Sequence, residues 1–211
     1  MASRKKRVVN SSYKRFSVNR FVNDNFNLAL DQIKEFKRYI IFATALLVFA
    51  ILIGVIFPWL IQRQVLKLIT QLVKDTKDLG WFQIIAFIMF NNMETAFFAM
   101  ALGIFFGIAP FFIVLINGYI LGFVTNKTIS SLGILSLGKL IPHGIFELPA
   151  ILISLALGFR LGMFLFVYRG KNKGREFWQW IKDSLRIFVF IVIPLLVIAG
   201  IIEGTAIIIL G

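Results

Sequence analysis

The hydrophobic positions of this chain form long apolar runs, and short charged segments separate them. A helix needs about 20 mostly apolar residues to cross a bilayer. The pattern therefore predicts five membrane spans, over residues 39–61, 81–106, 108–125, 142–168 and 185–210. The second and third spans are divided at Gly107 and Pro110, because glycine permits a bend and proline interrupts a helix. A re-entrant hairpin across residues 81–125 is the alternative.

Two further segments repeat apolar residues at helical spacing but carry many charges. Residues 21–38 predict an amphipathic helix on the membrane surface, and residues 62–79 predict an interfacial or extramembrane helix. Residues 126–140 are expected to form a loop, as is the basic segment 169–175. The predicted fold class is an all-α, polytopic transmembrane helical bundle. Its domains are a basic arm with an interfacial helix, residues 1–38, and a transmembrane domain, residues 39–211.

Composition supports a membrane protein. Hydrophobic residues make up 59% of the chain and charged residues only 16%, against about 25% charged in ordinary soluble domains. The formal net charge is +13, but the basic residues flank apolar spans, so the expected partner is the lipid bilayer and not nucleic acid. The chain has no cysteine, which excludes disulfides and thiolate metal sites. No cofactor is expected.

The distribution of basic residues predicts the orientation. Residues 1–38 carry ten Lys or Arg, and residues 169–186 carry six. Four spans separate these segments, so both lie on one side of the membrane. Basic segments remain on the cytoplasmic side. We therefore expect a multi-pass cell-membrane protein with its N-terminus in the cytoplasm and its C-terminus outside.

Several polar residues interrupt the predicted spans, and polar residues inside a membrane are costly and often functional. Most of them fall in the outer half of the bundle, as judged from about 1.5 Å of rise per residue. They are Asn91, Asn92, Glu94, Asn117, His143, Glu147 and Glu203. His143 and Glu147 are four residues apart and share a helix face. The set predicts either an interhelical hydrogen-bond cluster or a proton or ion site, with catalysis a weaker third interpretation. No metal site is predicted.

Other residues of the spans have packing interpretations. Arg160 is expected to extend toward the cytoplasmic interface or to pair within the bundle. Three pairs of glycines at four-residue spacing allow close approach of helices, within the bundle or between copies in a homo-oligomer. The pairs are Gly103 with Gly107, Gly118 with Gly122, and Gly158 with Gly162.

The order of these motifs resembles that of a known family. The motifs are Asn91-Asn92, Gly103, Gly107, Asn117-Gly118, Leu121-Gly122, Pro142-His143-Gly144-x-x-Glu147-Leu148-Pro149-Ala150, Gly158, Leu161-Gly162 and Ile202-Glu203. Together they resemble the stage II sporulation protein M family of integral membrane proteins, over roughly residues 39–211. After Glu203 this chain continues with Gly-Thr-Ala-Ile, whereas family members often have an aromatic residue and Thr-Pro.

The resemblance implies a function without catalysis. In endospore formers, family members act as membrane scaffolds for peptidoglycan-degrading partners. The first hypothesis is therefore a scaffold for membrane or extracytoplasmic proteins that is not itself an enzyme. The alternative is a small transporter, channel or proton-coupled module that uses Glu94, His143, Glu147 and Glu203.

Overall fold

The fold is built entirely from helices in the part of the chain that the structure describes. The computed structural model describes residues 17–210, except for the side chains of residues 139–143 and 207–210. The helices are α1 (Val18–Glu35), α2 (Lys37–Ile56), α3 (Gln62–Thr76), α4 (Trp81–Ala101), α5 (Ile108–Leu132), α6 (Ile141–Val167), α7 (Lys173–Ile187) and α8 (Ile193–Leu210). Short 3-10 helices cover Leu102–Ile104 and Ile134–Leu140, and a π-helix at Phe188–Val192 joins α7 to α8.

Five helical segments within residues 17–206 are long and apolar enough to cross a membrane. They are Lys37–Ile56, Trp81–Ile104, Ile108–Leu132, Gly144–Val167 and Lys173–Ala206. The predicted all-α bundle with five spans is confirmed. The central helix is α6, which packs against α2, α4, α5 and α8.

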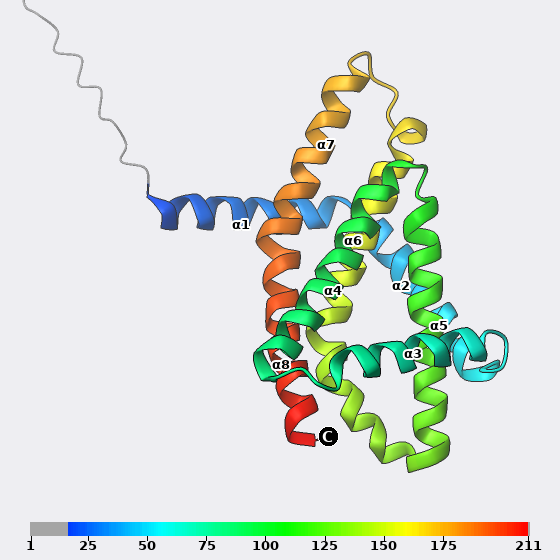
Figure 1. The fold of residues 1–211 in the computed structure, drawn as a ribbon. Coiled ribbons are helices and arrows are strands. Elements are labelled where there is room, and N and C mark those ends of the chain that lie inside the picture. Colours follow the sequence, from blue (N-terminus) through cyan, green and yellow to red (C-terminus); the bar gives the residue numbers. More distant parts are fainter. Residues whose placement is uncertain (1–16, 211) are drawn as a thin grey trace, which may run out of the picture.

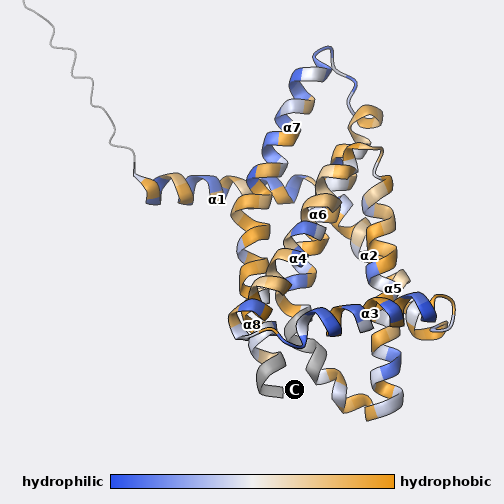
Figure 2. Cartoon of the chain, in the orientation of Figure 1, coloured by the Kyte–Doolittle hydropathy of each residue, from blue (hydrophilic) through white to orange (hydrophobic). Residues whose placement is uncertain are grey.

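Two amphipathic helices indicate where the bundle meets the membrane surfaces. Figure 1 shows α1 and α3 running across the direction of the long helices, at two different levels. Figure 2 shows hydrophilic and hydrophobic residues together on both, the pattern of helices that lie in a membrane interface. Helix α2 connects the two levels. Its 20 residues span about 30 Å at 1.5 Å per residue, which equals the thickness of the hydrocarbon core.

The connections between the long helices lie at the two ends of the bundle. The α6–α7 connection lies at the same end of the molecule as α1, and the C-terminal end of α8 lies at the opposite end (Figure 1). The turn between α4 and α5 contains Phe106 and Gly107, both with left-handed φ angles, of 56° and 71°. Glycine adopts this conformation without strain, whereas a bulky residue such as phenylalanine rarely adopts it.

Helices extend into two segments where we expected loops. Helix α5 continues to Leu132, beyond its predicted end at residue 125. Here the Asn126 side chain donates a hydrogen bond of 2.9 Å to the Val55 carbonyl at the end of α2. The Tyr119 hydroxyl likewise donates to the Phe57 carbonyl, at 2.9 Å. These bonds satisfy carbonyls that a helix end leaves without partners, and they fix α5 against α2.

The second difference is on the α1 side of the bundle. Helix α7 begins at Lys173, within the segment 169–175 that we expected to be a loop. The helix has Glu176 in its first turn and Arg186 in its last turn, positions where these charges favour a helix. It continues through the π-helix into α8.

The six glycines that the sequence singled out lie where helix backbones meet. A Cβ atom at Gly103 would collide with the backbone of Gly158, and one at Gly158 would collide with the Ala99 carbonyl. Gly162 faces the backbone of Gly103 and Gly107 in the same way. On α5, a Cβ at Gly118 would lie 2.6 Å from the Ala50 Cβ, and Gly122 faces the Ile51 carbonyl of α2. These contacts lie within one copy of the chain.

Candidate functional site

The predicted polar residues do not form one buried cluster among the side chains described. Glu147 on α6 is buried, with 3% of its surface exposed, and Glu203 on α8 is half-buried. Both carboxylates have interaction partners. Helices α6 and α8 pack together. The side chain of His143 lies outside the described residues, so its place beside Glu147 stays a prediction.

The polar residues of α4 lie on a different surface. Asn91 and Glu94 are exposed, and Asn92 is half-buried. Figure 2 shows this hydrophilic segment interrupting α4. Asn91 donates a long hydrogen bond of 3.5 Å to Asn92 Oδ1. Glu94 has no hydrogen bond or ion pair with any described residue. It lies thirteen residues after Trp81, or about 20 Å along a helix that crosses about 30 Å of hydrocarbon.

Aromatic residues surround these two polar side chains. Phe90, Phe97 and Phe98 are 63%, 42% and 44% exposed, and they share the outward face of α4 with Asn91 and Glu94 because of the helical repeat. The opposite face of α4 carries the buried residues Ala96, Ala99 and Met100. We call the outward face, defined by Phe90, Asn91, Glu94, Phe97 and Phe98, the α4 face.

Asn117 does not join either group. It is exposed on α5, and its side chain donates a hydrogen bond of 2.8 Å to the Ile113 carbonyl of its own helix. No group of three or more His, Cys, Asp or Glu residues suitable for a metal ion occurs among the residues searched, those that the structure describes.

A second polar group lies on the α1 side of the bundle, and the hydropathy pattern did not predict it. Arg160 of α6 is buried, with 6% exposed. Its guanidinium carbon lies 5.5 Å from the centre of the Phe36 ring and 4.6 Å from that of Trp180. Of the two alternatives expected for Arg160, the structure shows a contact within the bundle.

Helix α7 supplies the rest of this second group. Asp183 is 8% exposed and forms an ion pair of 3.1 Å with Arg186. Gln179 donates a hydrogen bond to the same Asp183 oxygen, at 3.0 Å. Arg186 Nε also donates to Asn25 Oδ1 of α1, at 3.1 Å. These contacts join α1 to α7, and the only signal in the sequence was the spacing of three residues between Asp183 and Arg186.

The fold and the placement of these residues define an integral membrane protein with an all-α bundle and polar side chains within its spans. Residues 31–206 match the family described as stage II sporulation protein M. The chain belongs to this family.

The similar curated proteins come from an archaeon. The chain is 36% identical over 119 residues to the uncharacterized protein MJ0706 of Methanocaldococcus jannaschii. The aligned region covers 54% of this chain and 51% of that protein. It is 32% identical over 123 residues to the uncharacterized protein MJ0793 of the same organism. This aligned region covers 55% of this chain and 66% of that protein. The matches thus span about half and about two thirds of these relatives. No solved structure matches the chain.

Proposed function

We propose that this protein is a non-catalytic membrane scaffold that holds partner proteins through the α4 face. One observation carries the proposal, the exposed carboxylate of Glu94 within a membrane-crossing helix. An acidic side chain near the centre of a span costs about 2.5–3.5 kcal/mol on insertion scales when lipid surrounds it. A neighbouring protein helix that supplies hydrogen-bond donors removes much of this cost.

The composition of the α4 face suits a protein neighbour. Glu94 accepts hydrogen bonds, and Asn91, three residues earlier, both donates and accepts them. Interhelical polar contacts in membranes contribute roughly 0.6–2 kcal/mol each. The exposed rings of Phe90 and Phe97 add apolar contact on either side. The polar pair would therefore determine where the partner helix binds, and the aromatic rings would increase the buried apolar area.

The orientation belongs to the same proposal. We place the α1 end of the bundle in the cytoplasm, because residues 1–38 and 169–186 carry the largest groups of Lys and Arg. The C-terminal end then faces outward, where membrane or extracytoplasmic partners are available. In a spore-forming host, the family points to peptidoglycan-remodelling proteins as the partner class.

Photocrosslinking from matched phenylalanines tests the scaffold. Phe90 on the α4 face and Phe49 on α2 are 63% and 56% exposed, and each is replaced in turn by benzoylphenylalanine in the native membrane. We expect a protein adduct from position 90 that Glu94→Leu abolishes, and lipid adducts from position 49. Lipid adducts alone from both positions would contradict the proposal. An adduct only with a second copy would assign the face to self-association instead.

A proton-coupled transporter is the second candidate, and the burial of Glu147 favours it. Glu147 and Glu203 both lie toward the end of the bundle opposite α1, on adjacent helices. Under this alternative, vesicles containing the purified protein leak protons in a pH-dependent manner, and Glu147→Gln abolishes the leak. Under the scaffold proposal no such leak occurs, and Glu147→Gln affects only stability or partner binding.

A further inference from the structure

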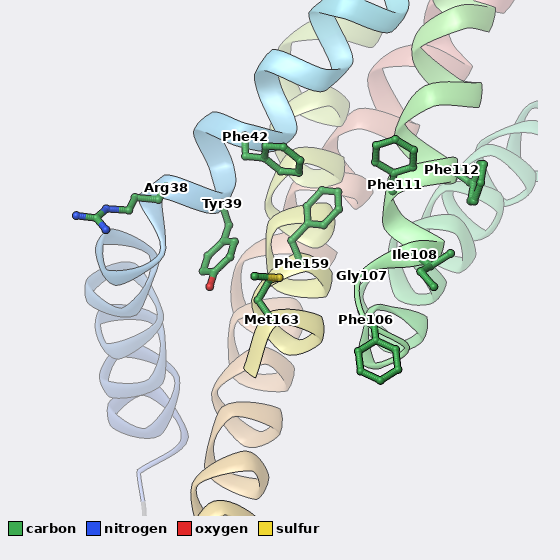
Figure 3. Close-up of a pocket in the computed structure, with 10 residues that line it drawn as sticks. All are labelled: Arg38, Tyr39, Phe42, Phe106, Gly107, Ile108, Phe111, Phe112, Phe159 and Met163. Carbon is green, nitrogen blue, oxygen red and sulfur yellow. The ribbon is translucent and has the colours of Figure 1, made fainter. Parts of the chain in front are cut away.

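An open apolar groove lies on the α1 side of the bundle, and its lining includes no residue of the α4 face. Its volume is about 610 Å³, within the range of about 300–1,000 Å³ that small-molecule sites occupy. Figure 3 shows Tyr39 and Phe42 of α2 on one side, Phe106, Ile108 and Phe111 on the other, and Phe159 and Met163 of α6 between them.

The position of the groove within the membrane follows from the helices that form it. Phe42 lies five residues after Lys37, so it is about 8 Å from the start of α2 and from the level of α1. The groove therefore begins at the polar boundary and extends into the hydrocarbon layer. An apolar occupant is required there, because water has no place beside such a lining within the bilayer core.

Several residues that line the groove are exposed on the outer surface of the bundle. Phe106 and Ile108 are 56% and 55% exposed, and Phe42 is 49% exposed. Phe106 also has a left-handed φ of 56°, which costs a non-glycine residue roughly 1–3 kcal/mol. Strain of this kind is often found where a residue contacts a ligand, and here the strained residue is at the edge of the groove, where its ring also contacts that of Phe166.

The charge at the mouth of the groove selects the kind of apolar molecule. Arg38 is at the edge of the groove, and its side chain extends outward from it (Figure 3). It is exposed and has no ion pair or hydrogen bond with any residue in the described part of the chain. Residues 17–38 and 169–186, which lie at this end of the bundle, carry ten basic and five acidic residues, an excess of five positive charges. A molecule with a negative head at the interface and a hydrocarbon tail matches both features.

We propose that the groove holds one acyl chain of an anionic phospholipid whose phosphate binds Arg38. The aromatic walls contact the chain, and the guanidinium group forms paired hydrogen bonds to the phosphate oxygens. The lipid belongs to the leaflet at the α1 level. This site is separate from the α4 face, so neither proposal depends on the other.

Competition between two lipids tests this site on the full chain. The purified protein is exchanged into nanodiscs with phosphatidylglycerol and phosphatidylcholine, each in turn carrying a diazirine on its tail, and adducts are mapped by mass spectrometry. We expect adducts concentrated at residues 106–112 and 159–163, with phosphatidylglycerol preferred. Arg38→Gln should lower this preference about fivefold, since one basic residue at an anionic surface contributes about 1 kcal/mol. Adducts spread evenly over all spans, or no preference for phosphatidylglycerol, would overturn the proposal.

Two further variants separate the groove from general charge and folding effects. Arg63→Gln removes an exposed charge from α3 at the other boundary, and it should leave adducts and preference unchanged. Met163→Trp fills the groove and should abolish adducts from both lipids, with an unchanged melting temperature as the check on folding. If Met163→Trp unfolds the protein, Arg38→Gln still decides, because an exposed side chain contributes little to the fold. A fivefold loss in Arg63→Gln equal to that in Arg38→Gln would contradict a specific site.

Discussion

The guanidinium carbon of Arg160 lies 4.6 Å from the centre of the Trp180 ring, which joins the central helix α6 to α7. Phe36, between α1 and α2, lies near the same guanidinium group. A buried cation held between aromatic rings is a stronger contact than an exposed one, because no water competes for it. Four helices are therefore connected at one side chain.

Replacing Arg160 by lysine should destabilise the protein, although the charge is kept. Lysine lacks the planar group that stacks on an indole ring, and a desolvated cation–π contact is worth about 2 kcal/mol or more. The check is thermal unfolding in detergent for Arg160→Lys, Trp180→Leu and the double variant. Coupled effects, with the double variant little worse than either single one, are expected. Strictly additive effects would show that the two side chains do not interact.

Helix contact at glycine gives a second prediction. Gly103→Ala places a methyl group against the Gly158 backbone, and overpacking of this kind costs roughly 1–3 kcal/mol. The matched control is Gly174→Ala on α7, where nothing lies within 4 Å of the added Cβ. The control should be neutral or slightly stabilising, because alanine favours a helix. Equal melting temperatures for Gly103→Ala and the control would contradict the close approach of the two backbones.

The attachment of α1 to α7 can be tested by hydrogen exchange. Asn25→Leu removes the acceptor of the Arg186 hydrogen bond, so amides of residues 18–35 should exchange faster while those of α6 stay protected. Lys34→Gln is the control. Lys34 forms an ion pair with Asp31, and the two side chains are 77% and 73% exposed. Exposed pairs of this kind contribute only about 0–1 kcal/mol. Unchanged exchange in Asn25→Leu would mean that this bond does not hold α1 in place.

The absence of cysteine from the chain makes the topology testable by labelling. Single cysteines at Ser17, Asn172 and Ser131 are treated in intact cells with a reagent that cannot cross the membrane. We expect labelling at 131 alone. Ser17 directly precedes α1 and Asn172 is in the α6–α7 connection at the same end, whereas Ser131 is in the last turn of α5, which ends at the opposite end. Labelling at 17 and 172 but not 131 would reverse the proposed orientation. Labelling of 17 and 172 from opposite sides would refute four spans between them.

The length of apolar runs predicted the five spans well, because a bilayer-crossing helix needs a fixed number of apolar residues wherever it packs. The ends of α5 and α7 were harder to predict. Both helices continue outside the apolar layer, where α5 is held by a tertiary hydrogen bond from Asn126 to Val55. A hydropathy pattern has no signal for such a bond.

The sequence also did not show which polar residues point into the bundle and which point outward. Helix α4 is apolar on most of its circumference, so its pattern does not indicate which side faces the bundle. Glu94 therefore could not be assigned to an exposed face in advance, nor Glu147 to a buried one. Arg160 was recognised as unusual, but its neighbours Phe36 and Trp180 come from distant segments and only the packed fold brings them together.

If a protein neighbour covers Glu94 in the native membrane, this neighbour should increase the mass of the extracted particle. The protein is extracted from its own membrane under mild conditions, and the mass of the extracted particle is compared for the natural chain and Glu94→Leu. We expect a complex larger than one 24.0 kDa chain for the natural protein, and a single folded chain for Glu94→Leu. A single chain in both cases, or an unchanged complex in Glu94→Leu, would contradict the scaffold proposal.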